Sequence, residues 1–268
     1  MTLLSPTASG LQSMVTVCEN FGLEYGMLFN VRKTVCILYT RKKGQPKPQV
    51  MLGGNKLEWK PYVKHLGNFL TEDLKENVEI SRKRGDIIGR INLINGHLGG
   101  VSSKHKIRVF QSQCSFYGAT AWRLGDKSVK LFHTAFNRGI RRTMDLPYAT
   151  HTRYLPELSG LPNSKDSISN RFMKMYKSML DSDNDHVRLI ALRGQSTAES
   201  ILGENLRLLS RDYGLPIDDL LKAKLRSNTC SIHDSCTVQA VKDILDGSLP
   251  DFFTCEEKCE WLEDLAVN

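Results

Sequence analysis

The sequence predicts an α+β fold, in which a small sheet with one helix is followed by a mostly α-helical region. Three observations lead to this fold class. Short β-branched runs and glycine turns lie before Thr71, the apolar spacing becomes helical after it, and helical spacing continues through most of the remaining chain. A chain of 268 residues with 40% hydrophobic and 25% charged residues can bury such a core.

The N-terminal part begins with an amphipathic helix. Its apolar positions are spaced 3, 4, 3 and 4 apart and share one face: Leu11, Met14, Cys18, Phe21 and Tyr25. The β-branched run at 35–39 then predicts a strand, and 49–52 with 57–59 predict a hairpin around Gly53-Gly54-Asn55. A further short strand is predicted at 63–67, and we expect a three-strand sheet from this part of the chain.

The part after Thr71 reads as a series of helices. One core-facing set is Ile80, Ile87, Ile91, Ile94 and Leu98, and a second is Ile107, Phe110, Cys114, Tyr117 and Ala121. Weaker helical patterns cover 168–180, 196–209, 217–225 and 238–245. The main boundary is expected between Thr71 and Leu74, with weaker breaks at 163–167 and 227–235.

Charge is distributed unevenly along the chain. The net charge is +8, but residues 230–268 carry −7, which leaves +15 on the first 229 residues. Such a basic excess suits a polyanion such as nucleic acid, because each neutralised phosphate releases counterions. A merely basic, solvated surface explains the same totals, so composition leaves both interpretations open.

In the segment 126–144, the basic residues are expected to lie on one side of a helix. On a helix, Val129, Phe132, Phe136 and Ile140 gather on one side, and a basic stripe gathers on the other: Lys127, Lys130, Arg138 and Arg141. The stripe contains no acidic residue, whereas an inert charged face usually mixes both signs. It therefore predicts contact with a phosphate backbone, which strengthens binding without reading sequence.

Two further basic clusters lie in the preceding predicted helices. Their candidate nucleic-acid-binding members are Arg82, Lys83, Lys104 and Lys106. Tyr117 and Trp122 could serve them as aromatic platforms, although aromatics at helical spacing are more often core residues.

The cysteines and the hydropathy of the chain indicate the cellular environment in which we expect it. Seven scattered cysteines, an odd number, indicate free thiols in a reducing compartment. No apolar run reaches the length of a membrane span and no signal peptide is recognisable, so we expect an intracellular protein, cytoplasmic or nuclear, without a membrane partner. Neither a nucleotide-binding loop nor a metalloprotease helix is present.

Residues 3–12, Cys18 and Phe21-Gly22 are followed by the phrase Gly26-x-x-Phe29-Asn30-x-x-Lys33-Thr34. Together they resemble the segment after the Tyr/Phe-Ala-Asp-Asp box of non-LTR (LINE-type, jockey-like) retrotransposon reverse transcriptases. The run Val63–Gly67 resembles the box that grips the primer end in that family, with His65, Leu66 and Gly67 as the matching positions. The helices that follow are similar in style to the thumb region.

The resemblance implies a partial palm at 1–72, a thumb-like helical region at 73–162 and a C-terminal helical region with an acidic tail at 163–268. Lys33 stands where the family has a lysine thought to assist the leaving pyrophosphate. In the complete family, aspartates upstream of this segment hold the Mg²⁺ ions for phosphoryl transfer. We therefore expect a truncated RNA-directed DNA polymerase with no metal site or cofactor of its own, inactive alone and binding at most RNA–DNA or another duplex.

Two alternatives come from other functional classes. A helical protein-interaction module could dock its acidic tail, from Cys230 onward, on its own basic face or on a partner. A zinc-binding module could use the soft ligands near the C-terminus, which are Cys230, His233, Cys236, Cys255 and Cys259. Their spacing matches no familiar zinc motif, and free thiols are the simpler explanation of the cysteines.

Overall fold

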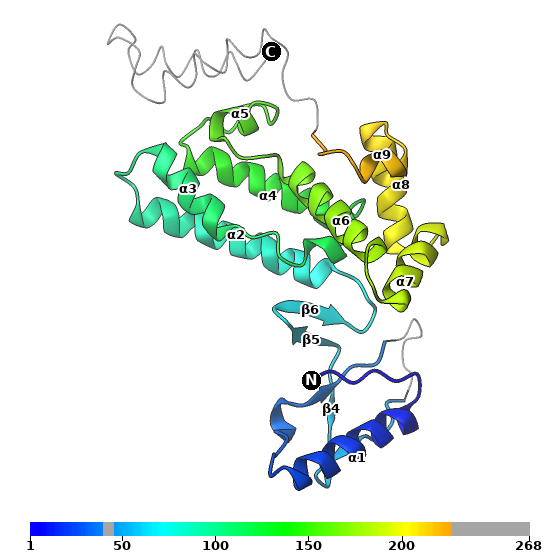
Figure 1. Cartoon of the computed structure of the whole chain (residues 1–268). Helices are drawn as coiled ribbons and strands as arrows, with labels where there is room; N and C mark the ends of the chain where they lie inside the picture. The colour runs from blue at the N-terminus through cyan, green and yellow to red at the C-terminus, as the bar shows by residue number, and fades with distance from the viewer. Residues whose placement is uncertain (40–45, 227–268) are drawn as a thin grey trace, which may run out of the picture. The chain divides into compact units, whose positions relative to one another are not determined.

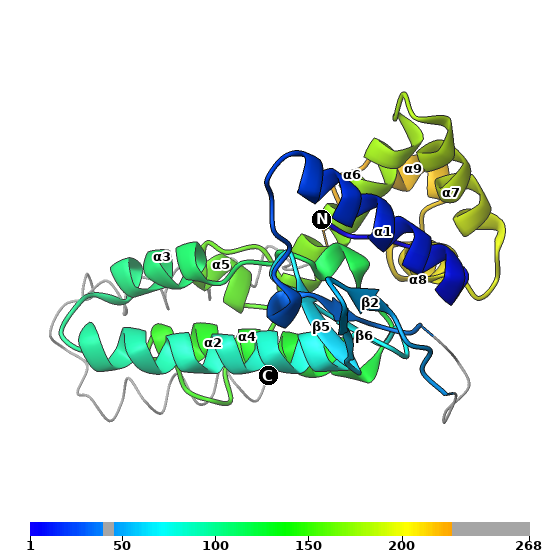
Figure 2. The ribbon, with the colours of Figure 1, turned by 90° about the horizontal axis from the view of Figure 1, so that it is seen from below.

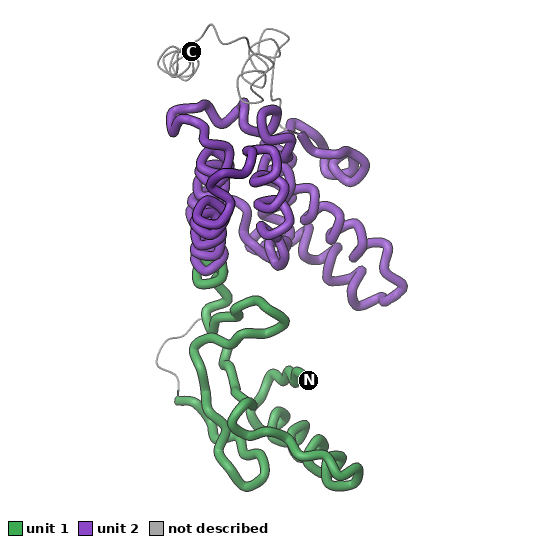
Figure 3. The backbone as a smooth tube through the Cα atoms, turned by 90° about the vertical axis from the view of Figure 1, so that its left-hand side faces the viewer, with its two compact units in different colours: residues 1–79 green, residues 80–268 purple. Residues whose placement is uncertain are grey.

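The structure is a computed structural model that describes residues 1–39 and 46–226 (Figure 1). It has the helix-rich α+β composition that the sequence predicts. The chain divides into two compact units, Met1–Glu79 and the residues from Ile80 onward, coloured separately in Figure 3. Each unit is described by itself below.

In the first unit, helix α1 (Ala8–Glu24) begins at Thr7, whose hydroxyl oxygen accepts a hydrogen bond from the Gly10 amide at 3.1 Å. Val15 is its deepest side chain and packs with Cys36, Val50, Leu52 and Leu57. The predicted apolar face is only partly correct. Leu11 and Cys18 are half-buried, but Met14, Phe21 and Tyr25 are exposed, because the small core contacts the side of α1 that carries Val15.

Polar side chains also hold α1 to the neighbouring hairpin. The Gln12 side chain donates to the Met51 carbonyl at 3.0 Å, and its amide oxygen accepts from the Met51 N–H at 2.7 Å. About two turns further along α1, the Glu19 carboxylate accepts a hydrogen bond from the Gly53 N–H. The helix is thus fixed to the hairpin at both Met51 and Gly53.

The strands of this unit form three separate pairs. Strand β1 (Val35–Cys36) pairs in parallel with β4 (Glu58–Trp59), β2 (Met51–Leu52) pairs antiparallel with β3 (Asn55–Lys56), and β5 (Tyr62–His65) pairs antiparallel with β6 (Asn68–Thr71). The expectation of a single three-strand sheet is therefore wrong for the described residues. The chain leaves the β2–β3 hairpin at Leu57, whose side chain enters the core, and then pairs with β1.

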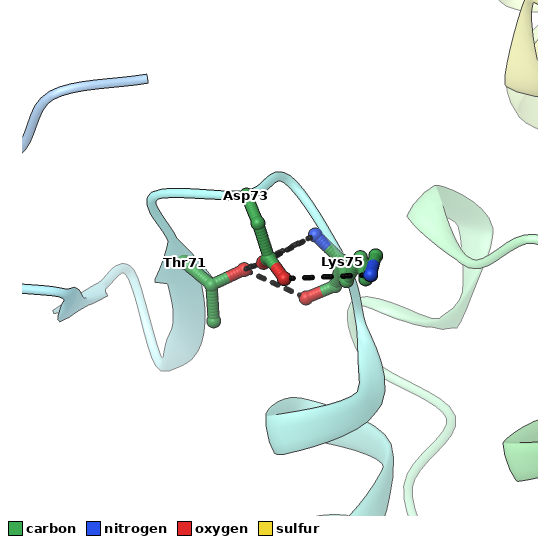
Figure 4. A network of polar contacts seen from close by, with 3 residues as sticks. All are labelled: Thr71, Asp73 and Lys75. Carbon is green, nitrogen blue, oxygen red and sulfur yellow. Dashed lines mark hydrogen bonds and ion pairs between the residues drawn. The ribbon is translucent and has the colours of Figure 1, made fainter. Parts of the chain in front are cut away.

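The connection from β6 into the next helix is a compact polar turn (Figure 4). The Thr71 hydroxyl donates to Asp73 and the Lys75 backbone N–H donates to the same carboxylate, at 2.8 and 3.1 Å. The hydrogen bond from Thr71 is the main reason that the pKa of Asp73 lies below its usual range. These bonds define where the strand region ends.

The second unit is helical. Its helices are α2 (Asn77–His97, beginning in the first unit), α3 (Ser103–Gln113), α4 (Lys127–Thr143), α5 (Leu155–Ser159), α6 (Ser164–Leu180), α7 (Asp185–Ser196), α8 (Ile201–Tyr213) and α9 (Ile217–Leu220), with a short 3-10 turn, η2 (Ala119–Ala121). Figure 2 shows α2 and α3 running along α4. None of the described helices is long and apolar enough to cross a membrane.

One core joins α2, α3 and α4. It buries the isoleucines predicted for α2, together with Ile107 and Phe110 of α3, as the helical spacing predicted. Tyr117 and Ala121 depart from that prediction and are exposed, because α3 ends at Gln113. The helices approach closely at Gly139 of α4, where an added Cβ would lie 2.9 Å from the Ile91 side chain and 2.9 Å from the Phe110 ring.

A second core in the same unit is built by α6 to α9 around Phe172, Tyr176 and Leu206. Asn205 of α8 connects it to the first core: its side chain donates to the Trp122 carbonyl and accepts from the Leu124 N–H, both at 2.8 Å. The Trp122 carbonyl and the Leu124 N–H follow η2 in the chain, and these two bonds give both backbone groups a hydrogen-bond partner.

Candidate nucleic-acid interface

Helix α4 carries the candidate interface. It begins at Asp126, whose carboxylate accepts from the Ser128 N–H at 2.7 Å, so the first turn is capped. Its inner side is buried as predicted, through Val129, Phe132, Phe136 and Ile140. The burial of this side fixes which residues of α4 face solvent.

Four basic residues of α4 are exposed, and the three of them that belong to the predicted stripe, Lys127, Lys130 and Arg138, are called the α4 basic face below. At about 100° per residue they lie within about 80° of one another around the helix, and Lys127 and Arg138 stand about 16 Å apart along its axis. Within the described parts of the chain, none of the three forms an ion pair with a carboxylate. Their charges are therefore directed to solvent.

Arg141, the fourth member of the predicted stripe, has a different place. Its Nε and Nη2 both donate to the Thr150 carbonyl, at 2.8 and 2.7 Å. The side chain is half-buried, and this burial lowers the pKa of its guanidinium from the usual value. Arg141 thus fastens the loop after α4 to the helix, which corrects its expected role as a surface contact.

Two residues near the basic face were not singled out by sequence reasoning. Arg142 is exposed and donates from Nη1 to the Asn92 side chain at 3.2 Å. Tyr148 is 76% exposed, with the Arg138 guanidinium 6.0 Å from its ring centroid. Helical spacing could have indicated Arg142, but the place of Tyr148 depends on a loop for which the sequence shows no periodicity.

The two lysines at the start of α3 separate in the structure. Lys104 is exposed, whereas Lys106 is only 4% exposed and its Nζ lies 2.9 Å from a carboxylate oxygen of Asp145. Lys106 precedes the buried Ile107 and turns toward the chain that follows α4. It forms an internal ion pair, which corrects its expected place among the surface cations.

The α2 cluster is also tied to neighbouring side chains. Arg82 is half-buried and pairs with Asp86 at 2.8 Å, one helical turn further on. The Lys83 ammonium lies 5.7 Å from the centroid of the Tyr117 ring. Tyr117 is exposed, but Trp122 is only 2% exposed, so the core interpretation of Trp122 is the correct one.

The residues that the family resemblance selected lie in the first unit. Lys33 is exposed at the end of a single 3-10 turn, η1 (Val31–Lys33), whose N-cap Asn30 accepts from the Lys33 N–H at 3.1 Å. His65, Leu66 and Gly67 come together at the tip of the β5–β6 hairpin. Leu66 and Gly67 adopt φ values of 46° and 82°, as the two-residue turn requires.

Metal ligands do not gather in the described part of the chain. No group of three or more His, Cys, Asp or Glu side chains there is arranged to hold a metal ion. The possible zinc ligands from Cys230 to Cys259 lie outside the described residues. Cys18, Cys36 and Cys114 are free thiols, and burial raises the pKa of Cys114 to about 12.

Comparisons with known proteins assign no family to this geometry. No family model matches the chain, and neither a curated protein nor a solved structure matches it.

Proposed function

We propose that this chain binds the phosphate backbone of nucleic acid through the α4 basic face, as a reverse-transcriptase fragment of a non-LTR retrotransposon. The observation that supports binding is the exposure of Lys127, Lys130 and Arg138 on one side of α4, where no carboxylate of residues 1–39 or 46–226 pairs with them. The reverse-transcriptase part of the proposal rests on the motif around Phe29-Asn30 and on Val63–Gly67. An intracellular location, cytoplasmic or nuclear, belongs to the same proposal.

The physical basis is counterion release. Each phosphate that a lysine or arginine neutralises frees condensed counterions, so affinity falls with salt in proportion to the number of contacts. Three contacts give a slope of about −2.7 for log affinity against log salt on a duplex, or a loss of about 40-fold between 50 and 200 mM salt. These contacts position the chain on a backbone without selecting a sequence.

The test is fluorescence anisotropy of a labelled RNA–DNA duplex with the full chain across a salt series. Changing Lys127, Lys130 and Arg138 together to Gln should remove most of the slope. The matched control changes three other exposed lysines to Gln, namely Lys174, Lys177 and Lys222, and removes the same total charge. Equal slopes for the two triple variants would refute the assignment to α4.

A second candidate function, protein interaction, is favoured by one observation. Helix α7 leaves Leu189, Ile190 and Leu192 substantially exposed, and gathered apolar side chains on a surface are typical of a protein contact. Apolar association strengthens in kosmotropic salts, whereas phosphate binding weakens as salt rises. Sedimentation of the chain in rising sulfate, with Ile190→Ser as the comparison, separates this function from the first. The zinc alternative remains a prediction, which metal analysis of the purified chain can test.

A further inference from the structure

We propose that Tyr148, held beside Arg138, is a stacking platform for an unpaired nucleobase, so the site prefers single-stranded nucleic acid or a frayed end to a continuous duplex. This inference rests on the proposed function and narrows its ligand. It depends on three features: a rigid turn, an exposed ring and neighbouring cations.

The turn that carries Tyr148 is tightly fixed. The Thr150 N–H donates to the Pro147 carbonyl at 3.2 Å, which makes Tyr148 and Ala149 the central residues of a turn. The Thr150 hydroxyl donates to the same carbonyl at 2.8 Å, and the Thr150 carbonyl accepts both bonds from Arg141. The ring is therefore presented from a turn fastened to α4, and little conformational freedom remains to be lost on binding.

The exposure of this ring is not explained by packing. Tyr148 is the most exposed tyrosine of the described residues, at 76%, and the Arg138 guanidinium lies beside its ring. Tyr154, six residues later, shows the contrast: it is buried and its hydroxyl accepts from Arg153 at 2.6 Å. Tyr154 serves the fold, whereas the Tyr148 ring offers its apolar surface to a ligand.

The chemistry of the site selects a base with an open face. A nucleobase stacks on an aromatic ring whatever its identity, and an adjacent arginine strengthens the stack. In a continuous duplex both faces of every base are covered by neighbouring pairs, so only an unpaired or terminal base can reach Tyr148. Lys127 and Lys130, on the same helix side as Arg138, attract the phosphates of the strand that carries this base.

The experiment compares two labelled oligonucleotides, a 12-nucleotide single strand and a duplex closed into a circle, which has no terminal base, each at about 50 mM salt where phosphate contacts are strong. Tyr148→Ala should weaken single-strand binding about 5- to 150-fold, the range typical for loss of one stacked base, and change duplex binding less than about twofold. Tyr25→Ala is the matched control, because Tyr25 is also exposed but its ring packs against Phe21.

A second variant gives a readout besides affinity. Tyr148→Trp should keep single-strand binding, and its added fluorescence, measured against the wild-type chain, should be quenched by an oligonucleotide but not by inorganic polyphosphate. If Tyr148→Ala binds the single strand like wild type while the α4 triple Gln variant does not, the platform is wrong and the proposed function stands. If Tyr148→Ala weakens both oligonucleotides equally, the preference for unpaired bases is wrong. If the wild-type chain binds neither oligonucleotide, both proposals fail.

Discussion

Arg138 and Arg141 lie one turn apart on α4, yet their substitution should have opposite consequences. Arg141→Met keeps the length and apolar stem of the side chain but removes both hydrogen bonds to the Thr150 carbonyl. A hydrogen bond to a charged group contributes about 1.5–3 kcal/mol, and two bonds to one oxygen do not add fully. Because Arg141 is still partly solvated, we expect a loss of about 2 kcal/mol in the free energy of unfolding.

Arg138→Met should leave that free energy within about 0.5 kcal/mol, because Arg138 is exposed and lies beside a ring, that of Tyr148, which is itself exposed. It should instead reduce the salt slope of nucleic-acid binding by about 0.9. Urea unfolding followed by far-UV circular dichroism measures the first quantity, and anisotropy across salt measures the second. The reasoning is refuted if Arg141→Met lowers the salt slope by about 0.9 and leaves unfolding unchanged, since Arg141 would then contact phosphate.

Two further predictions concern the packing of α4. Gly139→Ala should destabilise the chain by about 1–2 kcal/mol, because the cost of overpacking against Ile91 and Phe110 exceeds the gain in helix propensity from alanine. Gly89 has open space around it, so Gly89→Ala should be neutral or slightly stabilising in the same urea assay. Partial burial of His133 lowers its pKa from 6.5 to about 4. The unfolded chain therefore binds a proton at this histidine at a higher pH than the folded chain does, and the contribution of His133 to stability is lost as pH falls from about 6.5 to 4. His133→Gln should remove up to about 3 kcal/mol of the stability difference between these pH values, and an unchanged pH dependence of unfolding would contradict this.

Regular spacing is the reason that the helical core was predictable. The isoleucines of α2 and the aromatics of α4 recur every three or four residues, so one sequence window identifies the buried side. Helix α7 shows the opposite case: only Ala191 is buried in it, which leaves too weak a pattern to detect. The parallel pairing of β1 with β4 joins residues more than twenty positions apart, and each strand has only two residues. A pattern within one sequence window therefore does not indicate this pairing.

In the candidate site too, residues placed by helical spacing could be predicted and residues placed by distant partners could not. The angular position of Lys127, Lys130 and Arg138 on α4 follows from the helix itself, so their exposure could be predicted. The burial of Lys106 depends on Asp145, and that of Arg141 on Thr150, both partners supplied by the chain after α4. A helical projection cannot show such partners, because they come from outside the helix.

The bonds between Gln12 and Met51 have a consequence for association between molecules. The side-chain amide of Gln12 uses one of its N–H groups and its oxygen as a peptide group uses its donor and acceptor, so Gln12 pairs with the outer side of β2 in the way that another strand would. Strands with unpaired outer edges can recruit strands of other chains and aggregate. In this hairpin the Gln12 side chain occupies the outer N–H and C=O of Met51. A residue of α1 thereby blocks the pairing of another strand with β2 at this position.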